Sequence, residues 1–131
     1  MPKSKYGDKT AKALDNYIKD YKIPGWPSYF GKAAPVIDFA RNYATMRKKD
    51  LEMSDKFFHC KANYEATSRG QYGEKIAQKL SNLREYLDRN IKGDSLETSL
   101  IDQRANVRGR MGAKAGKSLR ESCPTHHTKY K

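Results

Sequence analysis

The segment between residues 76 and 91 carries the feature that most constrains the fold. Its large apolar residues recur at intervals of four, three, four and four positions, at Ile76, Leu80, Leu83, Leu87 and Ile91. This spacing collects the side chains on one face of an α-helix, and Gly93 follows where a helix C-terminus favours glycine. The stripe therefore predicts a helix that buries this face against other helices.

Two more helices are expected in the N-terminal third, with a connector between them. Apolar residues return at the helical spacing over residues 10–21, and they do so again from Pro35, which suits the first turn of a helix. Between these segments, "IPGWP" places two prolines and a glycine within five residues, which a helix interior does not tolerate. Residues 23–34 are therefore predicted to be a non-helical connector.

The central segment predicts a third helix, and a short fifth one is expected nearer the C-terminus. The third helix is expected to begin at Ser54, whose hydroxyl can accept a hydrogen bond from the free backbone amides, and to end at Gly70. Asp94 and Glu97 have the spacing of a capping box, which favours the start of a fifth helix.

The chain as a whole predicts an all-α fold. No segment shows the alternation of a strand, and 131 residues suit one domain. No run approaches the roughly 18 apolar residues needed to span a bilayer, so a soluble chain is expected. We predict a four-helix bundle domain over residues 1–109, which includes the short fifth helix, and an irregular basic C-terminal tail over residues 110–131.

Positive charge indicates a polyanionic partner. The chain has 27 Lys and Arg against 15 Asp and Glu, and residues 108–131 hold seven basic residues and one acidic residue, half of the net charge of +12. Such a balance attracts anionic lipid or nucleic acid. The residues expected to make these contacts are Arg47, Lys48, Lys49, Arg108, Arg110, Lys114, Lys117 and Arg120.

The third predicted helix has a broad apolar face. Phe57, Cys60 and Tyr64 share one stripe, and Phe58 begins an adjacent one, so these side chains are expected in the core. His59 lies to the side of both stripes. We expect it to make a hydrogen bond between neighbouring helices, with Asp102 or Asn106 as the acceptor.

The cysteines leave two interpretations open. Cys60 is either a small buried apolar side chain or, in an oxidising compartment, the partner of Cys123 in a disulfide that pins the tail. Together with His59, His126 and His127, the cysteines offer zinc donors, but their spacing matches no established zinc pattern. We therefore expect no metal site and no cofactor. A Cys–His nucleophile pair is disfavoured because adjacent helical residues point about 100° apart.

The central segment "SDKFFHCKANYEATSRG", with "GDSLETSLIDQRANVRGR" further along, resembles the serum amyloid A family. The matching positions are Asp55, Lys56, Phe57, Phe58, His59, Asn63, Tyr64, Glu65, Arg69, Gly70, Asp102, Gln103, Ala105, Asn106, Gly109 and Arg110. The resemblance implies a four-helix bundle with a wrapped C-terminal segment, oligomerisation, and binding of lipid surfaces, small apolar molecules and sulfated polysaccharide. The residues to which we assign structural roles are Asp55, Phe57, Phe58, His59, Asn63, Tyr64, Asp102 and Asn106.

Departures from the family pattern point to a distant member. The N-terminal segment "KTAKALDNYIKDY" is more polar than the lipid-seeking helix of the animal proteins. The two cysteines are more similar to bacterial and phage versions of the domain, which resemble modules of secreted toxin-like proteins. A bacterial or phage-type member is therefore expected.

These observations favour a non-enzymatic helical module that binds a polyanionic surface, anionic lipid or nucleic acid, as an oligomer. Two alternatives stay open. One is the effector domain of an antibacterial toxin, such as a nuclease using His59, Asp102 and His126, and the other is a structural part of a virion. The N-terminus lacks the apolar stretch of a secretory signal, so we expect leaderless export or incorporation into a virion.

Overall fold

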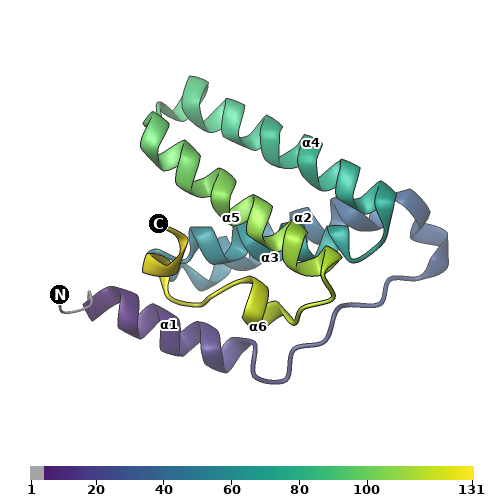
Figure 1. Cartoon of the computed structure of the whole chain (residues 1–131), viewed down its shortest axis with the longest axis horizontal. Coiled ribbons are helices and arrows are strands. Elements are labelled where there is room, and N and C mark those ends of the chain that lie inside the picture. Colours follow the sequence, from purple (N-terminus) through teal and green to yellow (C-terminus); the bar gives the residue numbers. More distant parts are fainter. Residues whose placement is uncertain (1–4) are drawn as a thin grey trace.

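Five main helices make up most of the chain (Figure 1). The structure is a computed structural model that describes residues 5–131. Its main helices are α1 (Lys5–Tyr17), α2 (Ala34–Lys49), α3 (Asp55–Thr67), α4 (Gln71–Leu87) and α5 (Leu96–Lys114). The shorter elements are η1 (Ser28–Ala33), η2 (Asp88–Lys92), α6 (Leu119–Ser122) and η3 (His127–Tyr130). The described residues contain no strand, so the predicted all-α class is confirmed.

Helix α3 is the centre of the fold, and ten of its thirteen residues are buried. Helices α2, α4 and α5 pack around it, and α4 and α5 lie side by side (Figure 1). Two glycines bring backbones into direct contact with α3. A Cβ atom on Gly109 of α5 would lie 2.1 Å from the carbonyl oxygen of Cys60, and one on Gly73 of α4 would lie 1.9 Å from that of Ala66. Any side chain at either glycine would push the helices apart.

Helix α1 packs its apolar stripe into the core. Leu14 and Ile18 are buried, and the ring of Tyr17 lies 6.1 Å from that of Phe58. The helix begins at Lys5 and ends at Tyr17, earlier at both ends than the predicted range of 10–21. The connector after it is non-helical up to Pro27, as predicted, but then forms the 3₁₀ turn η1.

The C-terminal part of the chain differs most from the prediction. Helix α5 has 19 residues and is the longest of those described, so it is not short, and the boundary expected after residue 109 lies inside it. Its N-cap is Ser95, which accepts a hydrogen bond from the amide of Thr98, rather than Asp94. The segment expected to be an irregular tail instead forms α6 and η3, and it contributes Leu119, Cys123 and Tyr130 to the core.

The physical reason is that α5 packs on α3 with small residues. Ala105, Gly109 and Gly112 lie on its buried face, so the usual sign of a buried helix face, a row of large apolar residues, is missing there.

Two further expectations are wrong. Ser54 makes no capping hydrogen bond with its side chain. The large apolar stripe of α4 is only partly buried, since Ile76 and Leu80 are half-buried and Leu83 is exposed. The fully buried residues of α4 are instead small or polar, namely Gly73, Ala77, Ser81 and Glu85. Among residues 5–131, no helix combines the length and the apolar composition that crossing a membrane requires.

Candidate functional site

Helices α4 and α5 expose apolar side chains on their outer faces. Leu83 is 53% exposed and Leu100 is 50% exposed, although both belong to helices that pack in the fold. The exposed aliphatic and methionine residues of α4, η2 and α5 are Leu83, Leu87, Ile91, Leu96, Leu100, Val107 and Met111. An apolar surface rimmed by polar residues is typical of a site that binds a partner or a membrane.

One groove in this region has a basic rim. It has a volume of about 490 Å³ and lies between α5 and the C-terminal segment. Its apolar floor is formed by Leu100, Val107 and Tyr130, and none of its lining residues is acidic. The cations at its rim are Arg104, Arg108, Lys129 and Lys131. We call this feature the basic groove.

A second groove, of about 280 Å³, lies between α2 and α4. Tyr43, Leu83 and Leu87 line it together with the cations Arg84 and Lys92, but Asp88 also takes part. This groove is therefore apolar but of mixed charge.

The structure spreads the eight predicted polyanion contacts over several elements. Arg47, Lys48 and Lys49 are exposed in the last turn of α2, and Lys117 is exposed before α6. Of the eight, Arg108 is the one that lines the basic groove.

The other three predicted contacts are engaged within the chain. Arg110 donates a 2.8 Å hydrogen bond to the side-chain oxygen of Asn63. Lys114 lies 3.0 Å from Glu74, and Arg120 lies 2.9 Å from Asp15.

The residues assigned structural roles lie mostly in the core. Phe57 and Phe58 are buried, and their rings contact each other edge to face. The Tyr64 hydroxyl donates a hydrogen bond to the backbone carbonyl of Lys117. Asn63 is fully buried and donates to the side-chain oxygen of Asn106 at 3.0 Å. Its own side-chain oxygen accepts from Ser81 and Arg110, so it links α3 to α4 and α5.

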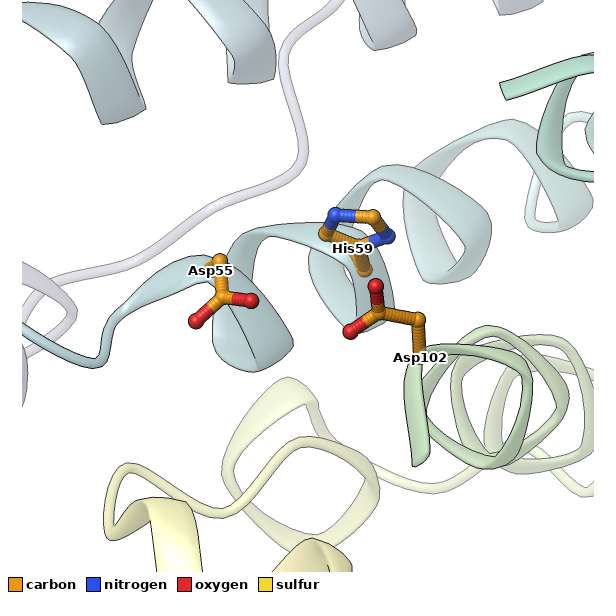
Figure 2. Close-up of side chains that lie close together, drawn as sticks. All are labelled: Asp55, His59 and Asp102. Atoms are coloured by element: carbon orange, nitrogen blue, oxygen red, sulfur yellow. The ribbon is translucent and has the colours of Figure 1, made fainter. Parts of the chain in front are cut away.

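A polar cluster surrounds His59 on α3. Figure 2 shows Asp55 one turn before His59 on the same helix, and Asp102 reaching from α5 toward the imidazole ring. Lys56 forms an ion pair with Asp102 at 2.8 Å and also contacts Asp55. Glu85 of α4 completes the cluster, since its Oε1 lies 3.7 Å from His59 Nδ1. We call these five residues the His59 cluster.

The His59 cluster is not held by an ion pair to the imidazole. Burial, followed by the positive charge of Arg84, lowers the pKa of His59 to about 4. Burial, followed by the negative charge of Asp102, raises the pKa of Glu85 to about 7. At neutral pH the imidazole is therefore uncharged. The separation of 3.7 Å between His59 Nδ1 and Glu85 Oε1 is also too long for a hydrogen bond. Within residues 5–131, the His59 side chain makes no hydrogen bond to Asp102 or Asn106 either, so the hydrogen bond expected between the helices is not formed.

The three residues proposed for a nuclease do not come together. His59 and Asp102 share the cluster, but His126 Nε2 lies 3.0 Å from Asp8 Oδ1 of α1. The acid and base set expected for the toxin alternative is therefore not formed by these residues.

A second charged cluster lies at the other end of α3 and was not expected from the sequence. Glu65 is fully buried and accepts hydrogen bonds from Tyr21 at 2.7 Å and from Asn42 at 2.6 Å. It also pairs with Arg41 at 2.7 Å and with Lys61 at 3.2 Å. We call these five residues the Glu65 cluster. The signal in the sequence is that Lys61 and Glu65 carry opposite charges four residues apart, a spacing that lets them pair on one face of a helix.

The Glu65 cluster keeps its carboxylate charged. Burial alone would raise the pKa of Glu65, but the charge of Lys61 and the hydrogen bond from Tyr21 outweigh it and hold the pKa below its usual value. This arrangement ties α3 to α2 and to the residue Tyr21 that follows α1.

The structure joins Cys60 to Cys123 by a disulfide. Both residues are fully buried, and 63 positions separate them in the sequence. Cys60 is therefore the disulfide partner of Cys123 and not a free buried thiol. The bond fastens the C-terminal segment to the middle of α3.

Comparison with known proteins agrees with this architecture. Residues 28–126 match the family described as Serum amyloid A protein. The chain is 43% identical to the serum amyloid A protein of Notamacropus eugenii over 75 residues, covering 57% of this chain and 59% of that protein. It is 40% identical to serum amyloid A-2 protein of Oryctolagus cuniculus over 89 residues, covering 67% and 72%. For serum amyloid A-1 protein of Homo sapiens the identity is 38%, covering 65% and 72%.

The fold is thus that of a small helical protein with a C-terminal segment wrapped along its bundle. The chain belongs to the serum amyloid A family. The relatives named here come from vertebrates, so the comparisons do not support the expected bacterial or phage-type member, nor the toxin class that followed from it.

Proposed function

We propose that the chain is a non-enzymatic module that binds the surface of anionic lipid. The observation that carries the proposal is the basic groove, whose apolar floor and four rim cations match the two parts of an anionic lipid. Apolar burial favours the acyl region, and the cations favour the negative headgroups. An apolar floor fits lipid better than nucleic acid, which presents phosphates and stacking bases.

Exposed apolar residues next to the groove enlarge this contact. Met111 and Leu96 lie on α5, which also provides one wall of the groove, and they are 58% and 56% exposed. The cations at the end of α2 add to the long-range attraction for a negative surface. The second groove, between α2 and α4, supports association of several copies of the chain, because its apolar lining is uncovered in a single copy.

The test uses vesicle co-sedimentation with phosphatidylglycerol or phosphatidylcholine vesicles. The unaltered chain should bind the anionic vesicles, and the bound fraction should fall as salt rises. The double variant Arg104→Gln/Arg108→Gln should lose most of this binding, since it removes two of the four rim cations.

The matched control is Lys75→Gln/Lys79→Gln, which removes two exposed cations of α4 outside the basic groove. Equal losses in the two double variants would show that only net charge matters and would contradict the groove. Equal binding to both kinds of vesicle would contradict the anionic preference. Sedimentation velocity of the same samples without lipid measures self-association, and a monomer at all concentrations would remove that part of the proposal.

A further inference from the structure

The His59 cluster contains a buried carboxylate oxygen without a hydrogen-bond donor. Glu85 is 4% exposed, and its Oε1 atom has no hydrogen-bond partner. Its other oxygen accepts only a long hydrogen bond, 3.4 Å, from Ser99. Buried charged groups are usually paired or coordinate metals, so this oxygen requires an explanation.

The donor atoms around this oxygen form two groups that share Asp102. The ligand atoms of Asp55, His59 and Asp102 all lie within 4.8 Å of one another, and those of Glu85, Asp88 and Asp102 do so as well. His59 Nδ1 and Glu85 Oε1 are 3.7 Å apart, which is too far for a hydrogen bond. Two ligands of a tetrahedral zinc ion would be separated by about 3.3 Å, given bond lengths near 2.0–2.1 Å.

The carboxylates around the cluster outnumber the cations that face them, so one more cation would balance the charge. Four carboxylates face two cations that are at least partly buried, Lys56 and Arg84. A third cation, Lys92, is 65% exposed and lies 4.0 Å from Asp88. A bound divalent ion would compensate the excess negative charge in a place where water screens it poorly.

We propose that the His59 cluster binds a divalent transition-metal cation of the zinc type, with His59, Glu85 and Asp102 as ligands and Asp55 at the entrance. An imidazole nitrogen combined with carboxylates suits zinc, whereas calcium and magnesium prefer sites made of oxygen alone. The side chain of Asp55 is 44% exposed, and with Lys56 it lines a surface groove of about 190 Å³ through which an ion can enter.

Lys56 has a definite part in this proposal. Its ammonium group lies 2.8 Å from Asp102 Oδ1, so it competes with a metal ion for that oxygen. Metal binding requires Lys56 to release Asp102 and to keep its contact with Asp55. Removing the ammonium should therefore strengthen the binding of zinc.

The test is calorimetric titration of ZnCl₂ into untagged full-length chain that has been treated with EDTA and desalted. The unaltered chain should bind one Zn²⁺ per molecule. Glu85→Gln should weaken the affinity at least about tenfold, a loss seen even for residues that only support metal ligands. The matched control is Glu74→Gln, the same change on the same helix, which should leave the affinity unchanged within about twofold.

A second variant keeps the test decisive if Glu85→Gln does not fold, which far-ultraviolet circular dichroism would reveal. Lys56→Gln should bind Zn²⁺ several-fold more tightly than the unaltered chain. Nitrogen resonances of the His59 ring should shift on addition of zinc, which a purely structural histidine would not show.

Several results would overturn the proposal. They are absence of zinc binding, equal affinity in Glu85→Gln, affinity in Lys56→Gln that is unchanged or weaker, and loss of binding in His127→Gln while Glu85→Gln binds normally. The last result would place the metal at the C-terminal histidine pair instead. Tight binding of Ca²⁺ in preference to Zn²⁺ would overturn the assignment of the metal.

Discussion

Helix α3 buries charged side chains in two places, and the two are built differently. In the Glu65 cluster, the carboxylate receives donors from Tyr21, Arg41, Asn42 and Lys61. In the His59 cluster, Glu85 Oε1 has no donor. Glu65 is 0% exposed and Glu85 is 4% exposed, so burial does not distinguish these two carboxylates. The difference in hydrogen bonding does, and it separates a cluster that completes the fold from one that has capacity for a ligand.

The largest expected effect comes from breaking the satisfied cluster. Glu65→Ala leaves the positive charges of Arg41 and Lys61 without their carboxylate, and Lys61 is 1% exposed. Removing one partner of a buried pair should lower the free energy of unfolding by about 3–5 kcal/mol. Urea denaturation followed by circular dichroism measures this loss.

The control for that experiment is Glu74→Ala, which removes a half-exposed ion pair with Lys114. It should cost less than about 1 kcal/mol. If Glu65→Ala were no more destabilising than this control, the Glu65 cluster would not be the structural element described here.

The next effect concerns the disulfide, which is attached to α3 between the two clusters. The double variant Cys60→Ala/Cys123→Ala should lose about 2–4 kcal/mol, since the unfolded chain is no longer closed into a loop. Neither cluster takes a side chain from residues 115–131, so both should persist. Hydrogen exchange should therefore show protection lost in residues 115–131 and kept in α3, and loss throughout α3 would contradict the independence of the clusters.

The smallest expected effect is a gain in stability from changing the unsatisfied cluster. The pKa of Glu85 is raised to about 7 from an ordinary value of 4.5, so the folded chain binds a proton that the unfolded chain has released. The contribution of Glu85 to stability should therefore be lost as the pH rises from about 4.5 through about 7. In EDTA at pH 8, Glu85→Gln should be more stable than the unaltered chain by about 1–3 kcal/mol.

Thermal melting at pH 5 and at pH 8 measures that gain. The two proteins should differ little at pH 5, where the side chain is neutral in both. A variant less stable than the unaltered chain at pH 8 would mean that Glu85 has a stabilising partner, and the contrast between the clusters would fail.

Helical periodicity was sufficient to predict most of the helices and the core face of α3. Phe57, Phe58 and Cys60 were assigned to that face because large apolar residues at helical spacing usually mark it, and the structure buries all three. The same rule failed on α4, where Leu83 and Leu87 point outward. The buried face of α4 contains small residues, which permit the backbones of neighbouring helices to approach closely. Periodicity alone does not decide whether this face or the face with the large apolar residues is packed in the core.

The candidate sites were harder to predict than the helices. Arg108 was expected from charge alone, but its position beside Tyr130 depends on the return of the C-terminal segment along α5. Glu85 carries no sign of its role in the sequence, because its neighbours His59 and Asp102 come from helices far away along the chain. Such clusters depend on how helices cross, which a single sequence does not specify.

The contact between Gly109 and Cys60 has a consequence for the His59 cluster. Cys60 follows His59 directly, and Gly109 lies two turns beyond Asp102 on the same face of α5. No side chain separates the two main chains at this crossing, so direct backbone contact sets the spacing of the main chains that carry His59 and Asp102. Rotation about side-chain bonds, and not a shift of the helices, is therefore what can adjust the donor atoms of these two residues.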